Sequence, residues 1–167
     1  GKLKEGAEET IFRALALRQL ELPVGEFISD ALKSEVPEAA RELLIDNIKD
    51  EEKHDIALGY AAAALGTDPK AEAEARRFKE AWESHPDHTV LKAMVAERAL
   101  FFVLLPFFRF CGDSGLRTVS SDISRDETIH VSANSLVCRE LGLSVSPSLD
   151  QLRKAPIHWV MQHLGKS

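Results

Sequence analysis

The chain has two cysteines, a single tyrosine and no long hydrophobic run. Cys111 and Cys138 are too few for a disulfide framework and are typical of the reducing cytosol, so we expect a cytoplasmic location. The longest apolar run, Ala99 to Phe108, is about half a membrane span and contains Pro106, which predicts no transmembrane helix. No signal peptide is visible. Because the chain begins at Gly1 without Met, we expect a trimmed N-terminus or a tag remnant, with upstream sequence missing.

Composition predicts one globular domain. The hydrophobic content is 44% and the charged content 29%, which is typical of a folded protein. A chain of 167 residues is large enough for its own core, so we expect one domain over residues 1–167. The net charge of −6 disfavours nucleic acid or an anionic membrane as a partner. No alternating strand pattern of useful length occurs, which predicts an all-α fold.

Prolines near helix starts and glycines past helix ends divide the chain into helical segments. The expected segments are Glu5 to Lys33 (kinked or interrupted at Pro23), Pro37 to Leu65, Asp68 to Ser84, Asp87 to Phe110, Ser114 to Gly142, and a C-terminal segment from Ser146 that is broken at Pro156. The segment from Asp68 to Ser84 is largely polar. We therefore expect it to lie outside the main bundle as a crossover.

One spaced pattern occurs twice in the chain. A glutamate is followed thirty positions later by a second glutamate, and three residues after that by a histidine. The two copies are Glu21, Glu51 and His54, and Glu97, Glu127 and His130. Residues three apart are neighbours on a helix, so each Glu-x-x-His places a carboxylate and an imidazole on one face.

The thirty-residue offset matches an antiparallel helical hairpin measured from midpoint to midpoint. Two such hairpins would bring four carboxylates and two imidazoles together in the middle of one four-helix bundle. This is the ligand set of a dinuclear iron or manganese centre in ferritin-like carboxylate proteins. The simpler alternative is a metal-free bundle in which the glutamates are solvated and the histidines are packed core residues.

The surroundings of Glu97 argue against solvated glutamates. It lies in the segment from Lys92 to Phe110, where nearly every neighbour is apolar, and such a helix is buried on most sides. An unpaired carboxylate there would cost several kcal/mol or take up a proton. The adjacent Arg98 is a poor partner because consecutive helical residues point in different directions.

The second half of the chain also resembles a known family. ERALFF (Glu97 to Phe102), followed by SRDETIH (Ser124 to His130), resembles the third and fourth metal-binding helices of class I ribonucleotide reductase small subunits. EAARELLIDNIKDEEKH (Glu38 to His54) resembles the second helix of that family. The match covers roughly Glu21 to Leu141.

This resemblance implies a ferritin-like four-helix bundle with a crossover helix and a short C-terminal helical segment. It implies two iron ions, or an Fe/Mn or Mn/Mn pair, held by Glu21, Glu51, His54, Glu97, Glu127 and His130. Asp126 is expected to orient a ligand imidazole. The implied activity is that of an oxidoreductase that activates dioxygen for an unknown substrate. A small apolar substrate or a reductase protein is an expected partner, and a homodimer is the expected assembly.

Departures from the family leave alternatives open. The radical-bearing tyrosine of those subunits lies four residues after the first ligand histidine, and here that position is Leu58. The single tyrosine, Tyr60, is about 200° further around the helix and should face away from the metals. Pro23 disturbs the helix close to Glu21, so Glu26 is the fallback first ligand. A true radical-generating subunit and a ferritin-like iron-storage protein are the alternative functions. Four phenylalanines of the third helical segment are expected to be core residues or to wall a cavity for oxygen or substrate: Phe101, Phe102, Phe107 and Phe108.

Overall fold

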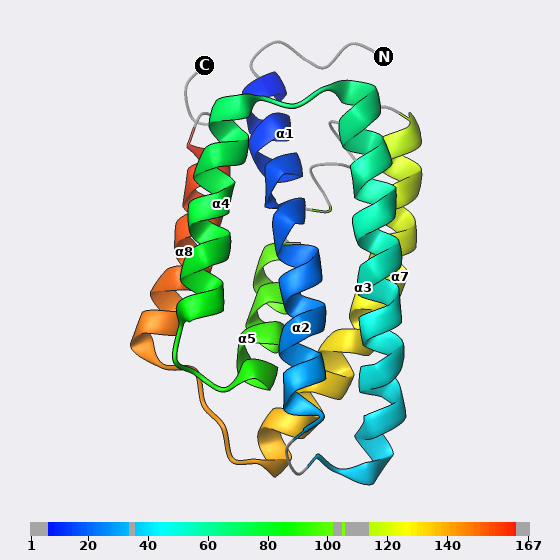
Figure 1. The fold of residues 1–167 in the computed structure, drawn as a ribbon, viewed down its shortest axis with the longest axis vertical. Helices are drawn as coiled ribbons and strands as arrows, with labels where there is room; N and C mark the ends of the chain where they lie inside the picture. Colours follow the sequence, from blue (N-terminus) through cyan, green and yellow to red (C-terminus); the bar gives the residue numbers. More distant parts are fainter. Residues whose placement is uncertain (1–6, 34–35, 102–104, 106–113, 163–167) are drawn as a thin grey trace.

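The computed structural model describes residues 7–33, 36–101, 105 and 114–162, and all regular elements in these ranges are helices (Figure 1). In chain order they are α1 (Ala7–Ala16), the 3-10 helix η1 (Leu17–Leu20), α2 (Glu21–Ala31), α3 (Glu38–Leu65), α4 (Pro69–Ser84), α5 (Thr89–Val95), the π-helix η2 (Ala96–Phe101), α7 (Ser114–Glu140) and α8 (Pro147–Met161). The all-α prediction is confirmed. Within these ranges no helix is both long enough and apolar enough to cross a membrane.

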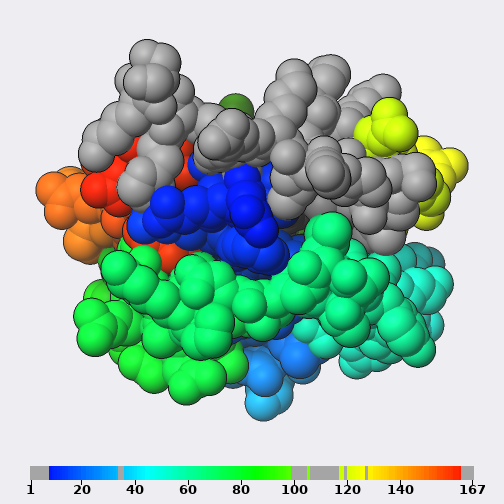
Figure 2. Space-filling model, turned by 90° about the horizontal axis from the view of Figure 1, so that it is seen from above, coloured from blue at the N-terminus to red at the C-terminus, as the bar shows by residue number. Residues whose placement is uncertain are grey.

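The helices form two groups. Helices α2, α3, α7 and α5 pack around one interior, because α2 contacts α3 and α5, and α7 contacts the same two helices. Helices α1, α4 and α8 form a second group in which each contacts the other two. Figure 2 shows α1, in blue, next to α4 in green and α8 in red. The polar helix α4 therefore lies outside the group of four, as its composition predicts.

Neighbouring helices in the group of four run in opposite directions. In Figure 1, α2 and α7 descend while α3 and α5 ascend. The chain leaves α3 at the top and runs downward through α4 before it starts α5. Consecutive members α3 and α5 consequently point the same way, and α4, which lies between them in the chain, runs in the opposite direction.

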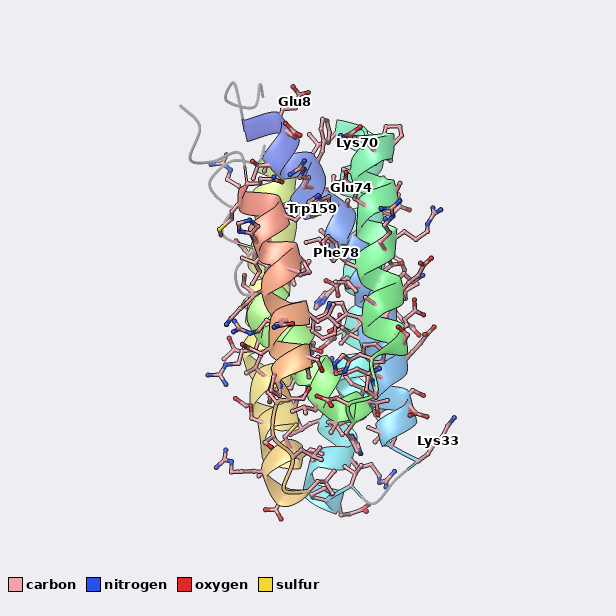
Figure 3. All side chains as sticks on the ribbon, turned by 90° about the vertical axis from the view of Figure 1, so that its left-hand side faces the viewer. Glu8, Lys33, Lys70, Glu74, Phe78 and Trp159 are labelled. Carbon is pink, nitrogen blue, oxygen red and sulfur yellow. The ribbon has the colours of Figure 1, made fainter. Side chains whose placement is uncertain are left out.

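An aromatic contact joins the second group of helices. The rings of Phe78 on α4 and Trp159 on α8 lie 5.4 Å apart between centroids (Figure 3). The indole Nε1 of Trp159 donates a hydrogen bond to Glu74, and the guanidinium of Arg13 on α1 lies 5.2 Å from the Trp159 ring centroid. Aromatic stacking and the cation–π contact therefore tie α1, α4 and α8 together.

The first helical segment is interrupted before Pro23, not at it. The α-helical hydrogen-bonding pattern gives way to a 3-10 turn at Leu17–Leu20, and Pro23 occupies the third position of α2. Proline lacks the N–H that would bond the carbonyl of residue 19, and its ring crowds that carbonyl. The strain of Pro23 is therefore taken up by the preceding turn, while proline itself is tolerated in the first turn of the new helix.

Predicted caps define most other boundaries. Asp68 accepts a hydrogen bond from the backbone N–H of Lys70 at the start of α4, and Ser146 accepts one from that of Leu149 at the start of α8. Gly66 and Gly142 end α3 and α7 with φ of 84° and 65°, values that favour glycine. The predicted break at Pro156 is wrong. Helix α8 continues through this buried proline to Met161, because its packing outweighs the loss of one hydrogen bond.

A buried lysine joins the end of α4 to α5. Lys92 is 4% exposed, and its ammonium donates to the carbonyl oxygens of Trp82, Glu83 and His85 at distances of 3.0, 3.4 and 2.9 Å. It also lies 4.4 Å from the ring centroid of Phe27 on α2. Burial lowers the pKa of Lys92, partly offset by nearby carboxylates. The ammonium thus donates to carbonyl groups at the end of α4, of which that of Trp82 also accepts from the backbone N–H of His85.

We expect Lys92→Met to lower the free energy of unfolding by about 2–3 kcal/mol, because buried carbonyls lose charged donors. The exposed Lys154, which pairs with Asp150 on the surface of α8, provides the control. Lys154→Met should change stability by less than about 0.5 kcal/mol. Urea denaturation followed by circular dichroism measures both values. Equal losses in the two variants would contradict the role assigned to Lys92.

Candidate metal centre

Side chains from four helical elements meet inside the group of four helices. Glu21 begins α2, Glu51 and His54 lie in α3, Glu97 lies in η2, and His130 lies in α7. Each of these side chains is at most 4% exposed. The structure therefore brings together five residues that the thirty-residue repeat places in the interior.

Two further predicted positions differ from these five. Glu127 lies in α7, but its side chain is outside the described part of the structure. The fallback ligand Glu26 is exposed and belongs to neither of the potential metal-binding groups found among the described residues. The geometry therefore favours Glu21 over Glu26.

The buried side chains form two groups that share Glu51. One group is Glu21, Glu51 and His54, the other is Glu51, Glu97 and His130, and the facing atoms within each group lie within 4.8 Å of one another. Nδ1 of His54 lies 3.8 Å from Oε2 of Glu51, whereas Nδ1 of His130 lies 3.4 Å from Oε1. The two oxygens of one carboxylate thus face two different imidazoles.

The outer glutamates complete each group. Oε2 of Glu21 lies 3.7 Å from Nδ1 of His54, and Oε2 of Glu97 lies 3.2 Å from Nδ1 of His130. The two imidazole centroids are 6.0 Å apart. Each group therefore combines carboxylate oxygens with one imidazole nitrogen, a set of donors suited to divalent transition metals.

Glu97 is presented by an irregular helical turn. Helix α5 changes to a π-helix at Ala96, one residue before Glu97. Glu97 is fully buried there, whereas Arg98 is exposed. A π turn contains an extra residue and occurs frequently at functional sites, because it alters the direction of side chains without ending the helix.

Aspartates from opposite helices hold the two imidazoles. Nε2 of His54 on α3 lies 2.8 Å from Oδ2 of Asp126 on α7, and Nε2 of His130 on α7 lies 2.9 Å from Oδ2 of Asp50 on α3. The contacts are therefore crossed between the two helices. An aspartate that accepts from Nε2 favours the tautomer with an unprotonated Nδ1, which faces the carboxylates here.

An asparagine bridges the carboxylates of Glu51 and Glu97. Nδ2 of Asn47 donates to Oε1 of Glu51 at 3.1 Å and to Oε1 of Glu97 at 3.0 Å. Asn134 on α7 donates in turn to the side-chain oxygen of Asn47 at 3.4 Å. These buried amides fix the carboxylates of α3 and η2 relative to each other.

Glu51 is a buried carboxylate with one oxygen left for a cation. Burial alone raises the pKa of Glu51, but the polar side chains of Glu21, His130 and His54 outweigh burial and hold it below the ordinary value. Its Oε2 accepts no hydrogen bond from the described residues. A buried anionic oxygen without a donor is costly unless a cation binds it. The buried Glu and His groups could therefore hold a metal ion.

The position of the family's radical tyrosine is apolar. Leu58 is 2% exposed, whereas Tyr60 is 75% exposed and faces away from the interior, as its helical position predicts. The side chains of Phe101, Phe102, Phe107 and Phe108 lie outside the described residues. The predicted cavity wall of phenylalanines therefore stays a prediction.

Sequence reasoning missed Asp50 and Asn47. A signal for Asp50 was present, because an aspartate precedes the glutamate in both motifs, as Asp50-Glu51-x-x-His54 and Asp126-Glu127-x-x-His130. Asn47 lies one helical turn before Glu51 on the same buried face, but no repeated spacing marks it. Its role is evident only from the hydrogen bond that joins it to Glu97 of η2.

No family model matches the chain, and no curated protein or solved structure matches it at the significance required. The resemblance to ribonucleotide reductase small subunits therefore stays a hypothesis based on motifs.

We expect Asp50→Asn and Asp126→Asn to weaken Mn²⁺ binding by about 10- to 100-fold each, because a neutral amide polarises the imidazole less than a carboxylate does. Asp46→Asn, on the exposed face of α3, is the matched control and should bind as the wild type does. Isothermal titration calorimetry measures the affinities. Wild-type affinity in Asp50→Asn would contradict the crossed arrangement.

Proposed function

We propose that this chain is a dinuclear metal carboxylate protein with a ferritin-like bundle, similar to ribonucleotide reductase small subunits. Its proposed activity is that of a dioxygen-activating oxidase or oxygenase. The observation that carries this proposal is the shared carboxylate of Glu51, whose two oxygens face the imidazoles of separate groups. A carboxylate shared by two groups of ligands could bind two metal ions, one in each group. A site for a single ion would need only one such group.

The donor set fits a pair of iron ions, or an Fe/Mn or Mn/Mn pair. Glu21, Glu51 and His54 would hold one ion, and Glu51, Glu97 and His130 the other. We assign Glu127 as a further ligand from the thirty-residue repeat. When bound, such a pair supplies electrons for the reduction of dioxygen and leaves coordination positions open to it.

The residues around the donors have positioning roles. Asp126 and Asp50 hold a proton at Nε2 of their imidazoles and so keep Nδ1 available as a donor atom. Asn47 orients the carboxylates of Glu51 and Glu97 through Oε1. Because these partners are themselves buried or partly buried, the donor atoms are organised before a metal binds.

The arrangement of the helices supports the ferritin-like assignment. Two antiparallel pairs, α2 with α3 and α5 with α7, pack against each other, and Glu21 of α2 and Glu51 of α3 are buried. Helix α4 connects the first pair to the second in the chain and lies outside the group of four, as a crossover connection requires.

The surroundings of the site favour an oxidase or oxygenase over a radical-generating subunit. Leu58 lies one helical turn beyond His54 and is buried, so it offers no phenol for oxidation. Tyr60, the single tyrosine of the chain, is 75% exposed. In this proposal the oxidising equivalents pass to a bound substrate, for which a small apolar molecule is the expected class. A reductase partner, a homodimer and a cytoplasmic location remain parts of the proposal.

Anaerobic loading with ferrous iron should give two metal ions per chain, one for each group. Glu51→Gln should abolish both sites because the two groups share this carboxylate. Glu21→Gln and Glu97→Gln should each remove one ion, since each residue belongs to one group. Glu42→Gln on the exposed face of α3 is the control. Metal analysis after desalting gives the content, and two ions bound to Glu51→Gln would rule out the assignment.

We expect the di-ferrous protein to consume dioxygen without forming a persistent tyrosyl radical, because Tyr60 faces away from the site. Tyr60→Phe should consume dioxygen at the wild-type rate, whereas Glu51→Gln should not react. An oxygen electrode and electron paramagnetic resonance measure the two outcomes. A stable tyrosyl signal in the wild type that disappears in Tyr60→Phe would instead support the radical-generating subunit.

A further inference from the structure

A cavity of about 270 Å³ lies between α2 and α3 and reaches Glu51. Its lining residues are Leu22, Gly25, Glu26, Ser29, Ile48, Glu51 and Glu52. This volume holds several water molecules, and therefore a cation that keeps part of its hydration shell. Glu51, which belongs to both potential metal-binding groups, forms part of the wall of this cavity.

Gly25 lets the cavity extend to Glu51. A Cβ atom at Gly25 would lie 3.7 Å from Cβ of Glu51, so the backbone of α2 passes close to this side chain. An alanine would fit at this distance, but a larger side chain would project into the space between the helices. The glycine therefore leaves space in the cavity wall that a larger side chain would fill.

The charges on the cavity favour a cation. Glu26 and Glu52 are exposed, whereas Glu51 is fully buried, and none of the lining residues is Lys or Arg. Behind this wall lies the buried carboxylate of Glu51, whose Oε2 accepts no hydrogen bond from the described residues and is an anionic acceptor for a cation. Acidic groups at a cleft raise the local concentration of cations and speed their association.

We propose that this cavity is the port through which divalent metal ions reach the buried site; this inference rests on the proposed function. The carboxylates of Glu26 and Glu52 attract the hydrated ion, and Oε2 of Glu51 accepts it as water is shed. From Glu51 the ion passes to either group, because this carboxylate is common to both. Glu26 therefore has a proposed role in the delivery of metal ions, although it belongs to neither of the two potential metal-binding groups.

The test is the rate of Co²⁺ uptake by the full chain, followed by stopped-flow absorbance of the bound ion. We expect Glu26→Gln/Glu52→Gln to reduce the second-order rate by about threefold to tenfold and to flatten its dependence on ionic strength. The final content should stay at two ions per chain. The matched control is Glu42→Gln/Asp46→Asn, which removes the same charge from exposed positions of α3 outside the cavity.

A steric variant tests the same route independently of charge. Gly25→Leu should slow uptake without changing the final content, because its side chain occupies the cavity. If Glu42→Gln/Asp46→Asn slowed cobalt uptake as much as Glu26→Gln/Glu52→Gln does, the proposed port would be wrong. The port would also be wrong if Glu26→Gln/Glu52→Gln and Gly25→Leu both took up cobalt at the wild-type rate and to full content. That result would leave the proposed function intact. Failure of the wild-type protein to bind cobalt, iron or manganese would instead refute the proposed function.

Discussion

Burial of ionisable side chains is the constraint on which the rest of this structure depends. Glu21, Glu51 and Glu97 lose their hydration in a helical interior, at a cost of several kcal/mol for each isolated charge. The helices around them supply compensating groups at defined positions, including the amide of Asn47 and the imidazole of His130. Helix α3 is central to this arrangement because it contacts both α2 and α7 and contributes polar groups to both clusters. An apolar interior would tolerate many helix registers, whereas these contacts restrict the packing to few.

The helix ends and several of the buried positions could be predicted from the sequence, because they depend on residues that are close together in the chain. Asp68 and Gly66 mark helix ends through side-chain capping and a positive φ, which depend on a few adjacent residues. The repeated thirty-residue spacing of Glu21 and Glu51 predicts that the donors of two antiparallel helical segments lie side by side, because helix rise and typical loop length fix the length of a hairpin. The exposure of Tyr60 likewise follows from helical periodicity alone.

Other features depend on how the helices pack, which single-chain patterns do not encode. Pro23 predicts an interruption of the helix, but the position of the 3-10 turn depends on which neighbouring turn changes its hydrogen-bonding pattern. Pro156 remains inside a helix because it is buried against other elements. The π turn that presents Glu97 and the bridging role of Asn47 both arise at contacts between helices. Asp50 carries a sequence signal, yet its partner on α7 becomes evident only from the three-dimensional arrangement.

The crossed aspartate–histidine contacts also bear on how the protein folds. His54 and Asp126 are 72 residues apart, and Asp50 and His130 are 80 apart, so each contact closes a long loop. In each contact one residue lies in α3, which belongs to the first half of the chain, and the other lies in α7, which belongs to the second half. The imidazoles can therefore be oriented only after the two halves of the chain have docked, which makes the site a late product of folding. A slip of one helical turn, about 5.4 Å, would break both contacts together. Completion of the site thus reports that the two halves have assembled in the correct register.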